Sequence, residues 1–175
     1  MPMQKLTVDD IVDLRAYERE RDAFRREVID LKKRRRIHLG TILTLTFENT
    51  DTVRFQIQEM ARVEHLDTDE AIAGELEAYN PLIPEPGHLS ATLFIELISD
   101  EDLRAWLPKL VGIERSIELR LADGTVIVDT PEAGHEAQLT RDEATAAVHY
   151  ISFEFTPEQV EAVAAGPVEL AVNHP

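Results

Sequence analysis

The spacing of apolar residues changes after Gly40, and this change constrains the fold more than any other feature of the chain. Before it, apolar residues recur at steps of three, four or seven, which predicts one long N-terminal amphipathic helix within residues 1–36. After it, apolar and polar residues alternate in short stretches, as in strands with one buried face. The helical stripe consists of Ile11, Leu14, Tyr17, Phe24, Val28 and Leu31. A chain with both patterns is expected to fold as α+β.

Residues 42–58 have the alternation expected of a β-hairpin. The stretches ILTLTF (42–47) and VRFQIQ (53–58) each alternate, and the turn-like ENTD lies between them. We therefore expect two strands here. Helical spacing resumes at Glu59, and a further helix is expected after a cap formed by Asp67 and Glu70.

That helix runs into AYNPLIP (78–84), a connector rich in proline. Pro81 lacks an N–H and disfavours the α region for the residue before it, so we expect Asn80 to be extended and the helix to end there. A strand carrying Leu93, Ile95 and Leu97 on one face is expected to follow.

Two later segments resemble each other and suggest an internal repeat. Residues 91–121 and 148–172 each read as strand, short acidic helix and strand, and RLADGTVIV between them has the Asp-Gly turn of a hairpin. The prediction for the whole chain, residues 1–175, is a single α+β domain with about seven mostly antiparallel strands. Its parts are the long helix at 1–36 and a sheet body at 37–175 with two strand-helix-strand units.

The charge of the chain is strongly negative and unevenly distributed. The formal net charge is −16. Residues 1–36 hold 11 Lys and Arg against 8 Asp and Glu, whereas residues 37–175 hold 7 against 26. An acidic body repels phosphate backbones and anionic lipids, so we expect neither nucleic acid nor membrane as a partner. The basic run KKRRR (32–36) is interpreted as a solvated helix end.

Several chemistries are excluded by residues that the chain lacks. It contains no cysteine, so it forms no disulfide, thiolate nucleophile or cysteine-ligated metal site of its own. No GxG, P-loop or GxSxG pattern is present, which removes the common nucleotide-binding and hydrolase signatures. No apolar run approaches the roughly 20 residues of a membrane span, and the cytoplasm is the expected compartment.

Two histidines are candidate ligands of a metal or haem. His149 shares strand parity with apolar residues of VHYISFEF, and His174 does so with residues of VELAV. The alternative for each is a core histidine whose ring is hydrogen-bonded within the protein. If a helical crossover makes their strands parallel, the two side chains lie roughly 20 Å apart and do not share a site.

A second polar group lies in QIQEMARVEH (56–65), where Gln56, Gln58, Glu59, Arg62 and Glu64 fall at a predicted strand-to-helix junction. Carboxylate and guanidinium groups at such a junction can bind a small polar ligand. They can equally form a surface ion pair, as Glu59 and Arg62 at positions i and i+3 would.

The stretches QIQEMARVE (56–64), AYNPLIP (78–84), VHYISFEFTPEQV (148–160) and the final His-Pro resemble the bacterial family called domain of unknown function 3501, over nearly the whole chain. The resemblance implies a genomic context of rubrerythrin-like and iron–sulfur oxidoreductase proteins, and hence an accessory role in peroxide or electron-transfer chemistry. The recurring polar positions of the family fall on Gln58, Glu59, Arg62, Glu64, Tyr79, Asn80, His149 and His174.

Three hypotheses follow. The first is a cytoplasmic, non-enzymatic partner of such a redox protein, docking through its acidic surface, with a homodimer left open. The second is a metal or haem protein that uses His149 or His174 with Glu59 or Glu64. The third is a small-molecule binding domain with a pocket formed by Gln58, Glu59, Arg62, Glu64, Tyr79 and Asn80. Enzymatic activity and the identity of any cofactor stay open.

Overall fold

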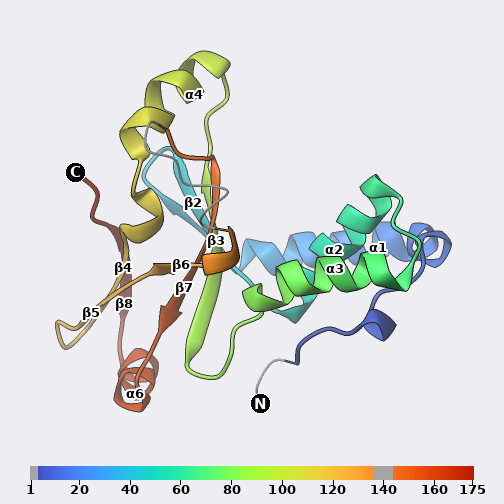
Figure 1. Cartoon of the computed structure of the whole chain (residues 1–175). Helices are drawn as coiled ribbons and strands as arrows, with labels where there is room; N and C mark the ends of the chain where they lie inside the picture. Colours follow the sequence, from blue (N-terminus) through green and yellow to red (C-terminus); the bar gives the residue numbers. More distant parts are fainter. Residues whose placement is uncertain (1–3, 136–143) are drawn as a thin grey trace. The chain divides into compact units, whose positions relative to one another are not determined.

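The computed structural model describes residues 4–135 and 144–175 and divides the chain into two units (Figure 1). The helical unit comprises residues 1–36 and 47–86, and the sheet unit comprises residues 37–46 and 87–175. The predicted α+β class is confirmed, with eight strands among the described residues in two sheets.

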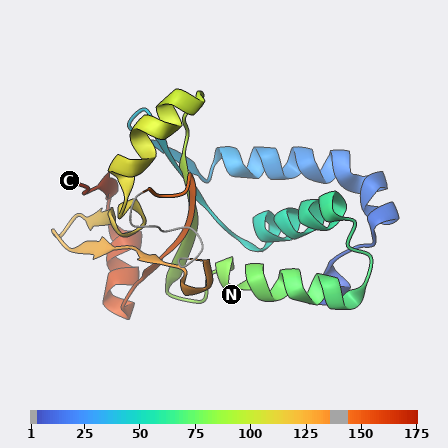
Figure 2. The same cartoon turned by 45° about the horizontal axis from the view of Figure 1, so that its top comes forward.

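Three helices, α1, α2 and α3, form most of the helical unit and lie side by side in Figure 2. The elements of this unit are the short 3-10 helix Val8–Asp10, α1 (Leu14–Lys33), α2 (Thr50–Glu64), α3 (Asp69–Tyr79) and the 3-10 helix Asn80–Leu82. The first helix begins later than predicted. Thr7 and Asp10 form a capping box on the 3-10 helix, whereas α1 begins after Asp13, whose side chain accepts from the N–H of Ala16 at 2.8 Å.

The predicted second strand of the hairpin, residues 53–58, is wrong, because these residues lie in α2. Val53 and Ile57 satisfy both period two and the helical step of four, so the alternation alone could not decide between strand and helix. The N-terminal capping residues of α2 distinguish the helix from a strand. Asn49 accepts from the N–H of Thr52 at 2.9 Å and Thr52 returns the bond, so the supposed turn ENTD is a helix cap.

The core of the helical unit packs α1 against α2. Tyr17, Phe24 and Val28 are buried in one cluster, as the stripe predicted. Phe24 meets Phe55 of α2 edge to face at 5.6 Å, and the guanidinium of Arg54 lies 4.2 Å from the centroid of the Phe24 ring. Aromatic and cation–π contacts of this kind add to the apolar burial that stabilises the helix pair.

The sheet unit contains a five-stranded sheet in the order β1-β2-β3-β7-β6 and a three-stranded sheet in the order β5-β4-β8. The strand pairs β3–β7, β6–β7, β4–β5 and β4–β8 are antiparallel. Its helices are α4 (Asp100–Trp106), α6 (Pro157–Ala165) and the 3-10 helices Leu107–Leu110 and Ile113–Arg115. The strands are β1 (Arg36–Leu39), β2 (Leu43–Phe47), β3 (His88–Ile95), β4 (Ile117–Leu121), β5 (Val126–Val128), β6 (Thr130–Pro131), β7 (Val148–Glu154) and β8 (Val168–Val172).

Both predicted strand-helix-strand repeats are present, and each one connects the two sheets. The first places β3 in the five-stranded sheet and β4 in the three-stranded sheet, and the second does the same with β7 and β8. The first strands pair with each other, with Leu93 opposite His149, and so do the second strands, with Leu119 opposite Leu170. The assumption of a parallel crossover within one sheet is therefore wrong.

Two turn predictions have opposite outcomes. The Asp123-Gly124 hairpin is confirmed, since β4 pairs with β5 and Gly124 has φ of +89°. Asn80, expected to be extended before Pro81, is instead helical, with φ of −55° and ψ of −33°. Pro81 occupies the first turn of the following 3-10 helix, a position where its missing N–H costs nothing.

Candidate functional site

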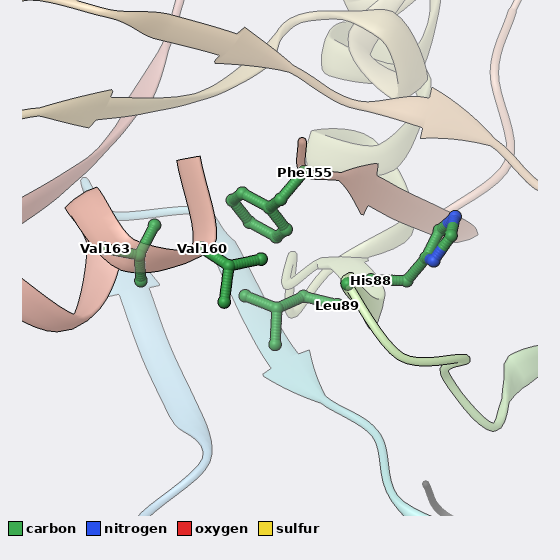
Figure 3. Close-up of a pocket in the computed structure, with 6 residues that line it drawn as sticks. His88, Leu89, Phe155, Val160 and Val163 are labelled. Atoms are coloured by element: carbon green, nitrogen blue, oxygen red, sulfur yellow. The ribbon is translucent and has the colours of Figure 1, made fainter. Parts of the chain in front are cut away.

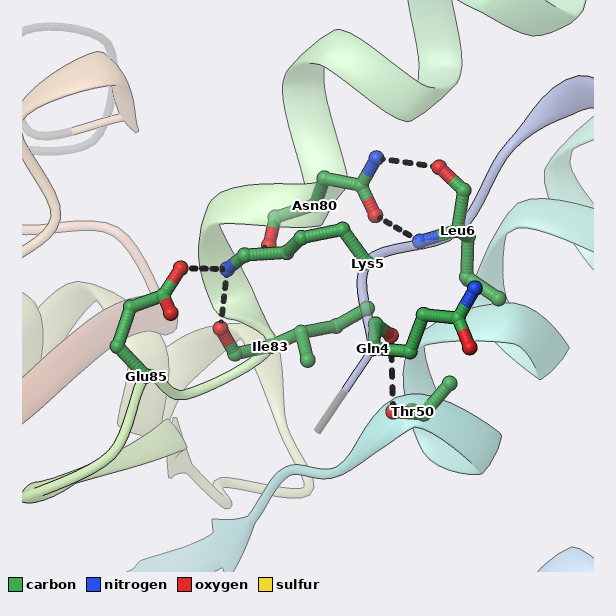
Figure 4. Close-up of polar contacts among 7 residues, drawn as sticks. All are labelled: Gln4, Lys5, Leu6, Thr50, Asn80, Ile83 and Glu85. Atoms are coloured by element: carbon green, nitrogen blue, oxygen red, sulfur yellow. Dashed lines mark hydrogen bonds and ion pairs between the residues drawn. The ribbon is translucent and has the colours of Figure 1, made fainter. Parts of the chain in front are cut away.

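Two of the predicted ligand-binding residues hold the N-terminal segment of the helical unit. Asn80 accepts from the N–H of Leu6 through Oδ1 and donates to the carbonyl of Leu6 through Nδ2, both at 2.9 Å (Figure 4). Gln58 is fully buried, and it accepts from the N–H of Val12 at 2.8 Å and donates to the carbonyl of Val12 at 3.2 Å. Each amide thus satisfies both backbone groups of one residue, which is a structural role.

Lys5 completes the contacts at the end of the proline-rich connector. Its ammonium donates to the carbonyl of Asn80 at 2.9 Å and to the carbonyl of Ile83, and it lies 3.3 Å from the carboxylate of Glu85 (Figure 4). The carbonyls at the end of α3 carry partial negative charge, so a lysine there is favourable. The connector is therefore fixed to Lys5 and Leu6 of the N-terminal segment.

Glu59 and Arg62 bind α1 rather than each other. The carboxylate of Glu59 accepts from the hydroxyl of Tyr17 at 2.7 Å and from Nε of Arg21 at 2.7 Å. The hydrogen bond from the Arg21 guanidinium lowers the pKa of Glu59. Arg62 pairs with the carboxylate of Glu18, another residue of α1.

The remaining two predicted ligand-binding residues are Glu64 and Tyr79, at the ends of α2 and α3. Glu64 is exposed at the end of α2, where burial and the charge of Glu64 together raise the pKa of Glu75. Tyr79 is half-buried at the end of α3. Gln58, Glu59, Arg62 and Asn80 thus have polar groups engaged within the helical unit, and a ligand at the predicted set stays a prediction.

His149 is buried on β7 as its parity predicted. Its Nε2 lies 2.7 Å from Oγ1 of Thr145 and 2.9 Å from the carbonyl of Ala146. Burial lowers the pKa of His149, so the ring is neutral, and since a carbonyl only accepts, Nε2 carries the proton.

His174 follows β8 in the other sheet of the sheet unit, with Nε2 2.8 Å from the carbonyl of Val111. Both imidazoles are thus bound through Nε2 to backbone carbonyls, as in satisfied structural histidines. In the described part of the chain, residues 4–135 and 144–175, no three His, Cys, Asp or Glu side chains gather as a metal site. Metal or haem binding by these histidines stays a prediction.

The sheet unit also buries the carboxyl residues Glu114, Glu118 and Asp129, which sequence reasoning did not single out. Among the residues that the structure describes, one carboxyl oxygen of Glu114 and one of Asp129 have no hydrogen-bond partner. The other oxygen of Asp129 accepts from the N–H of Ile117 at 3.2 Å. Burial raises the pKa of Asp129 to about 8, and the nearby charge of Glu114 acts in the same direction. Asp129 is therefore protonated near neutral pH.

An apolar pocket of about 180 Å³ opens on the surface of the sheet unit, and we call it the α6 pocket (Figure 3). It lies where β3 begins, β7 ends and α6 follows. Figure 3 shows Leu89, Phe155 and Val160 around one hollow, with the ring of His88 directed away from them. The lining residues are Gly87, His88, Leu89, Phe155, Val160 and Val163.

Gly87 sets the geometry of the α6 pocket. It extends the β3–β7 ladder by one bond, because the N–H of Phe155 donates to its carbonyl at 2.8 Å. The φ of Gly87 is +77°, a left-handed conformation that glycine adopts without strain, and a Cβ here would lie 3.4 Å from the carbonyl oxygen of Phe155. The close approach holds the Phe155 ring beside the start of β3.

The charged residues on the elements that form the α6 pocket are all acidic. The elements that form it, β3, β7 and α6, contain no Lys or Arg, whereas Glu154, Glu158 and Glu161 are all exposed on them. His88 lies 4.0 Å from Glu154 at the pocket margin. The sequence analysis did not predict this site, because its lining residues are ordinary apolar ones. The i, i+3 spacing of Val160 and Val163 after the aromatic Phe155 is a signal that could have indicated it.

The comparisons agree with this fold over the whole chain. The model of a family described as "Protein of unknown function (DUF3501)" matches residues 5–175. The chain belongs to the DUF3501 family. The resemblance drawn from QIQEMARVE and AYNPLIP is thereby confirmed.

A solved structure is similar to this DUF3501 protein as well. It is the crystal structure of a novel protein of unknown function from Burkholderia pseudomallei K96243, with 36% sequence identity and a TM-score of 0.90. The match covers 98% of this chain and 89% of that one. A search of the curated proteins finds no match. Among the residues that the structure describes, no helix has both the length and the apolar character needed to cross a membrane.

Proposed function

We propose that this DUF3501 protein is a cytoplasmic, non-catalytic binding protein that docks a basic segment of a partner protein through the α6 pocket. The observation that carries the proposal is an apolar hollow open to solvent, formed by elements that contain exposed Glu residues and no Lys or Arg. A segment with one large apolar side chain next to Lys or Arg residues matches both properties.

The size of the α6 pocket favours a protein segment over a metabolite. Pockets for drug-sized ligands measure roughly 300–1,000 Å³, whereas a cavity of about 150 Å³ holds a single benzene-sized group. The hollow of about 180 Å³ therefore suits one aromatic or branched aliphatic side chain. Burying such a side chain contributes roughly 1.5–3 kcal/mol, and the surrounding acidic residues speed encounter with a basic partner.

Two further points support binding without catalysis and suggest the partner class. Gln58, Glu59, Arg62 and Asn80, the polar groups first considered for ligand chemistry, are engaged in internal hydrogen bonds or ion pairs. The family resemblance implies a redox protein, rubrerythrin-like or an iron–sulfur oxidoreductase, as the partner to test first.

The test is calorimetric titration of each of these two redox proteins into the untagged protein at about 20 mM and about 500 mM salt. We expect binding that weakens with salt, and a loss of about tenfold or more for Val160→Asn. Val126→Asn is the matched control, because Val126 is 48% exposed on β5 and Val160 is 44% exposed on α6.

Equal losses for the two valine variants would contradict docking at the α6 pocket. Binding that ignores salt would argue against recognition by charge. If neither redox protein binds the wild type at low salt, the proposed partner class is wrong.

A further inference from the structure

Helix α4 of the sheet unit exposes an acidic and apolar surface. None of its seven residues is buried, and Ile98, just before it, is fully exposed. Its first turn consists of Asp100, Glu101 and Asp102. An isolated helix this short is marginal in water, so packing against another surface would stabilise it.

The helical unit has a basic and apolar surface at the end of α1, which is complementary in charge to α4. An open pocket of about 430 Å³, the Arg34 pocket, is lined by Leu31, Arg34, Arg35 and Phe47. Arg35 reaches the backbone carbonyls of Phe47 and Glu48 at 3.4 Å, whereas Arg34 is exposed at the helix end. The pocket thus combines an apolar lining with arginines.

The basic run around the Arg34 pocket is exceptional in this chain. Residues 32–36 supply five of its 18 Lys and Arg. One of the five, Lys33, is paired with Asp30 at 2.7 Å. In the described part of the chain, neither Arg34 nor Arg36 has an ion pair, so their charges are available to an acidic partner.

We propose that two copies of this chain associate by inserting Ile98 of one copy into the Arg34 pocket of the other. The apolar side chain of Ile98 meets Leu31 and Phe47, while the acidic first turn of α4 lies against Arg34 and its neighbours. Both halves of the contact are present in every copy. Self-association therefore needs no other molecule, and it uses a surface distinct from the α6 pocket.

The chemistry favours an acidic protein segment over a nucleic acid as the occupant of the Arg34 pocket. An acidic turn with one apolar residue supplies negative charge for the arginines and a side chain for Leu31 and Phe47, whereas a phosphate backbone supplies only the charge.

Sedimentation velocity of the full chain from about 5 to about 500 µM, at about 50 mM and about 500 mM salt, tests the association. We expect an oligomer that grows with concentration and dissociates at high salt. Ile98→Ser is expected to weaken association about tenfold or more, because it removes the inserted side chain. Val128→Ser, at an exposed valine of β5, is the control and should leave association unchanged.

Charge reversal gives the sharper experiment. D100K/E101K leaves the Arg34 pocket intact, and R34E/R36E leaves α4 intact. Each variant alone should be monomeric, whereas an equimolar mixture should associate, because the acidic α4 of the second variant can dock on the basic pocket of the first. Circular dichroism of each variant confirms that it is folded.

Three results would overturn the proposal. They are a wild type that stays monomeric throughout, variants that associate separately as well as the wild type does, and a mixture that stays monomeric. Tight binding of a fluorescent single-stranded RNA that R34E/R36E abolishes, without any self-association, would assign the pocket to nucleic acid instead.

Discussion

The carboxylate of Glu59 on α2 accepts two hydrogen bonds from one guanidinium on α1, from Nε and Nη2 of Arg21 at 2.7 and 3.1 Å. The same carboxylate accepts the hydroxyl of Tyr17 at 2.7 Å. Arg21 interrupts the apolar stripe of α1, and this pairing explains why a charged residue stands there. A bidentate contact adds geometric specificity to the apolar packing of the two helices.

Replacing Tyr17 by Phe tests the energetic weight of this network. The ring stays in the core while the hydrogen bond to a charged acceptor is lost, so we expect about 1–3 kcal/mol less stability at pH 7 by urea unfolding. The pKa of Glu59 is held below its usual value, so its contribution is present above about pH 4.5 and is lost as the pH falls further. The difference between Tyr17→Phe and the wild type should therefore shrink at pH 3.

Glu18→Gln is the control for Tyr17→Phe, because it breaks only the more exposed pair with Arg62 and should cost little. A Tyr17→Phe variant as stable as the wild type would show that the hydroxyl contributes nothing. A difference that persists unchanged at pH 3 would show that Glu59 is not the group responsible.

Replacing Asn80 by Leu should release the N-terminal segment. The variant leaves the N–H and carbonyl of Leu6 without their partner, which costs about 1–3 kcal/mol if they stay buried. Amide hydrogen exchange should show faster exchange at Leu6, with α1 and α2 little affected. Glu77→Leu, at an exposed position of the same helix, should leave exchange at Leu6 unchanged, and equal rates in both variants would refute the role given to Asn80.

Sequence patterns predicted the elements that depend on local signals. The Asp123-Gly124 hairpin and the buried parity of His149 follow from turn chemistry and from period two, and both are confirmed. The strand predicted at residues 53–58 failed because Val53 and Ile57 fit two periods. The side-chain cap formed by Asn49 and Thr52 was the better evidence, since it satisfies N–H groups that only a helix leaves open.

The candidate sites were harder to predict, because a polar residue in a sequence does not reveal its partner. In the sequence, Gln58 and Asn80 resemble ligand-binding amides. In the structure, Gln58 is hydrogen-bonded to Val12, 46 residues away, and Asn80 to Leu6, 74 residues away. The α6 pocket had the opposite difficulty. Its residues come from β3, β7 and α6, and only the antiparallel β3–β7 register brings Leu89 near Phe155.

Two glycine substitutions should shift stability in opposite directions. Gly87→Ala forces a side chain into the left-handed region, with a Cβ 3.4 Å from the carbonyl oxygen of Phe155, so we expect a loss of roughly 1–2 kcal/mol. Gly74→Ala in α3 meets open space and should gain roughly 0.5–1 kcal/mol. Urea unfolding measures both, and a stabilising Gly87→Ala would contradict the strained turn at the α6 pocket.

The protonated carboxyl of Asp129 predicts a stability that falls as the pH rises. Because burial raises the pKa of Asp129 from 3.8 to about 8, the folded state keeps a proton that the unfolded state loses above about pH 4. The contribution of Asp129 to stability is therefore full below about pH 4, falls between about pH 4 and pH 8, and is level above that range.

Asp129→Asn keeps an acceptor for the N–H of Ile117 and carries no titrating proton. Its stability relative to the wild type should rise with pH by up to about 1.4 kcal/mol per unit between about pH 4 and pH 8. Thermal unfolding across this range measures the difference. Asp123→Asn is the control, because a hydrogen bond from the N–H of Thr125 lowers the pKa of Asp123 and places its titration below the same range. A constant difference between Asp129→Asn and the wild type would show that Asp129 is already ionised in the folded protein, and its buried oxygen would then need a partner.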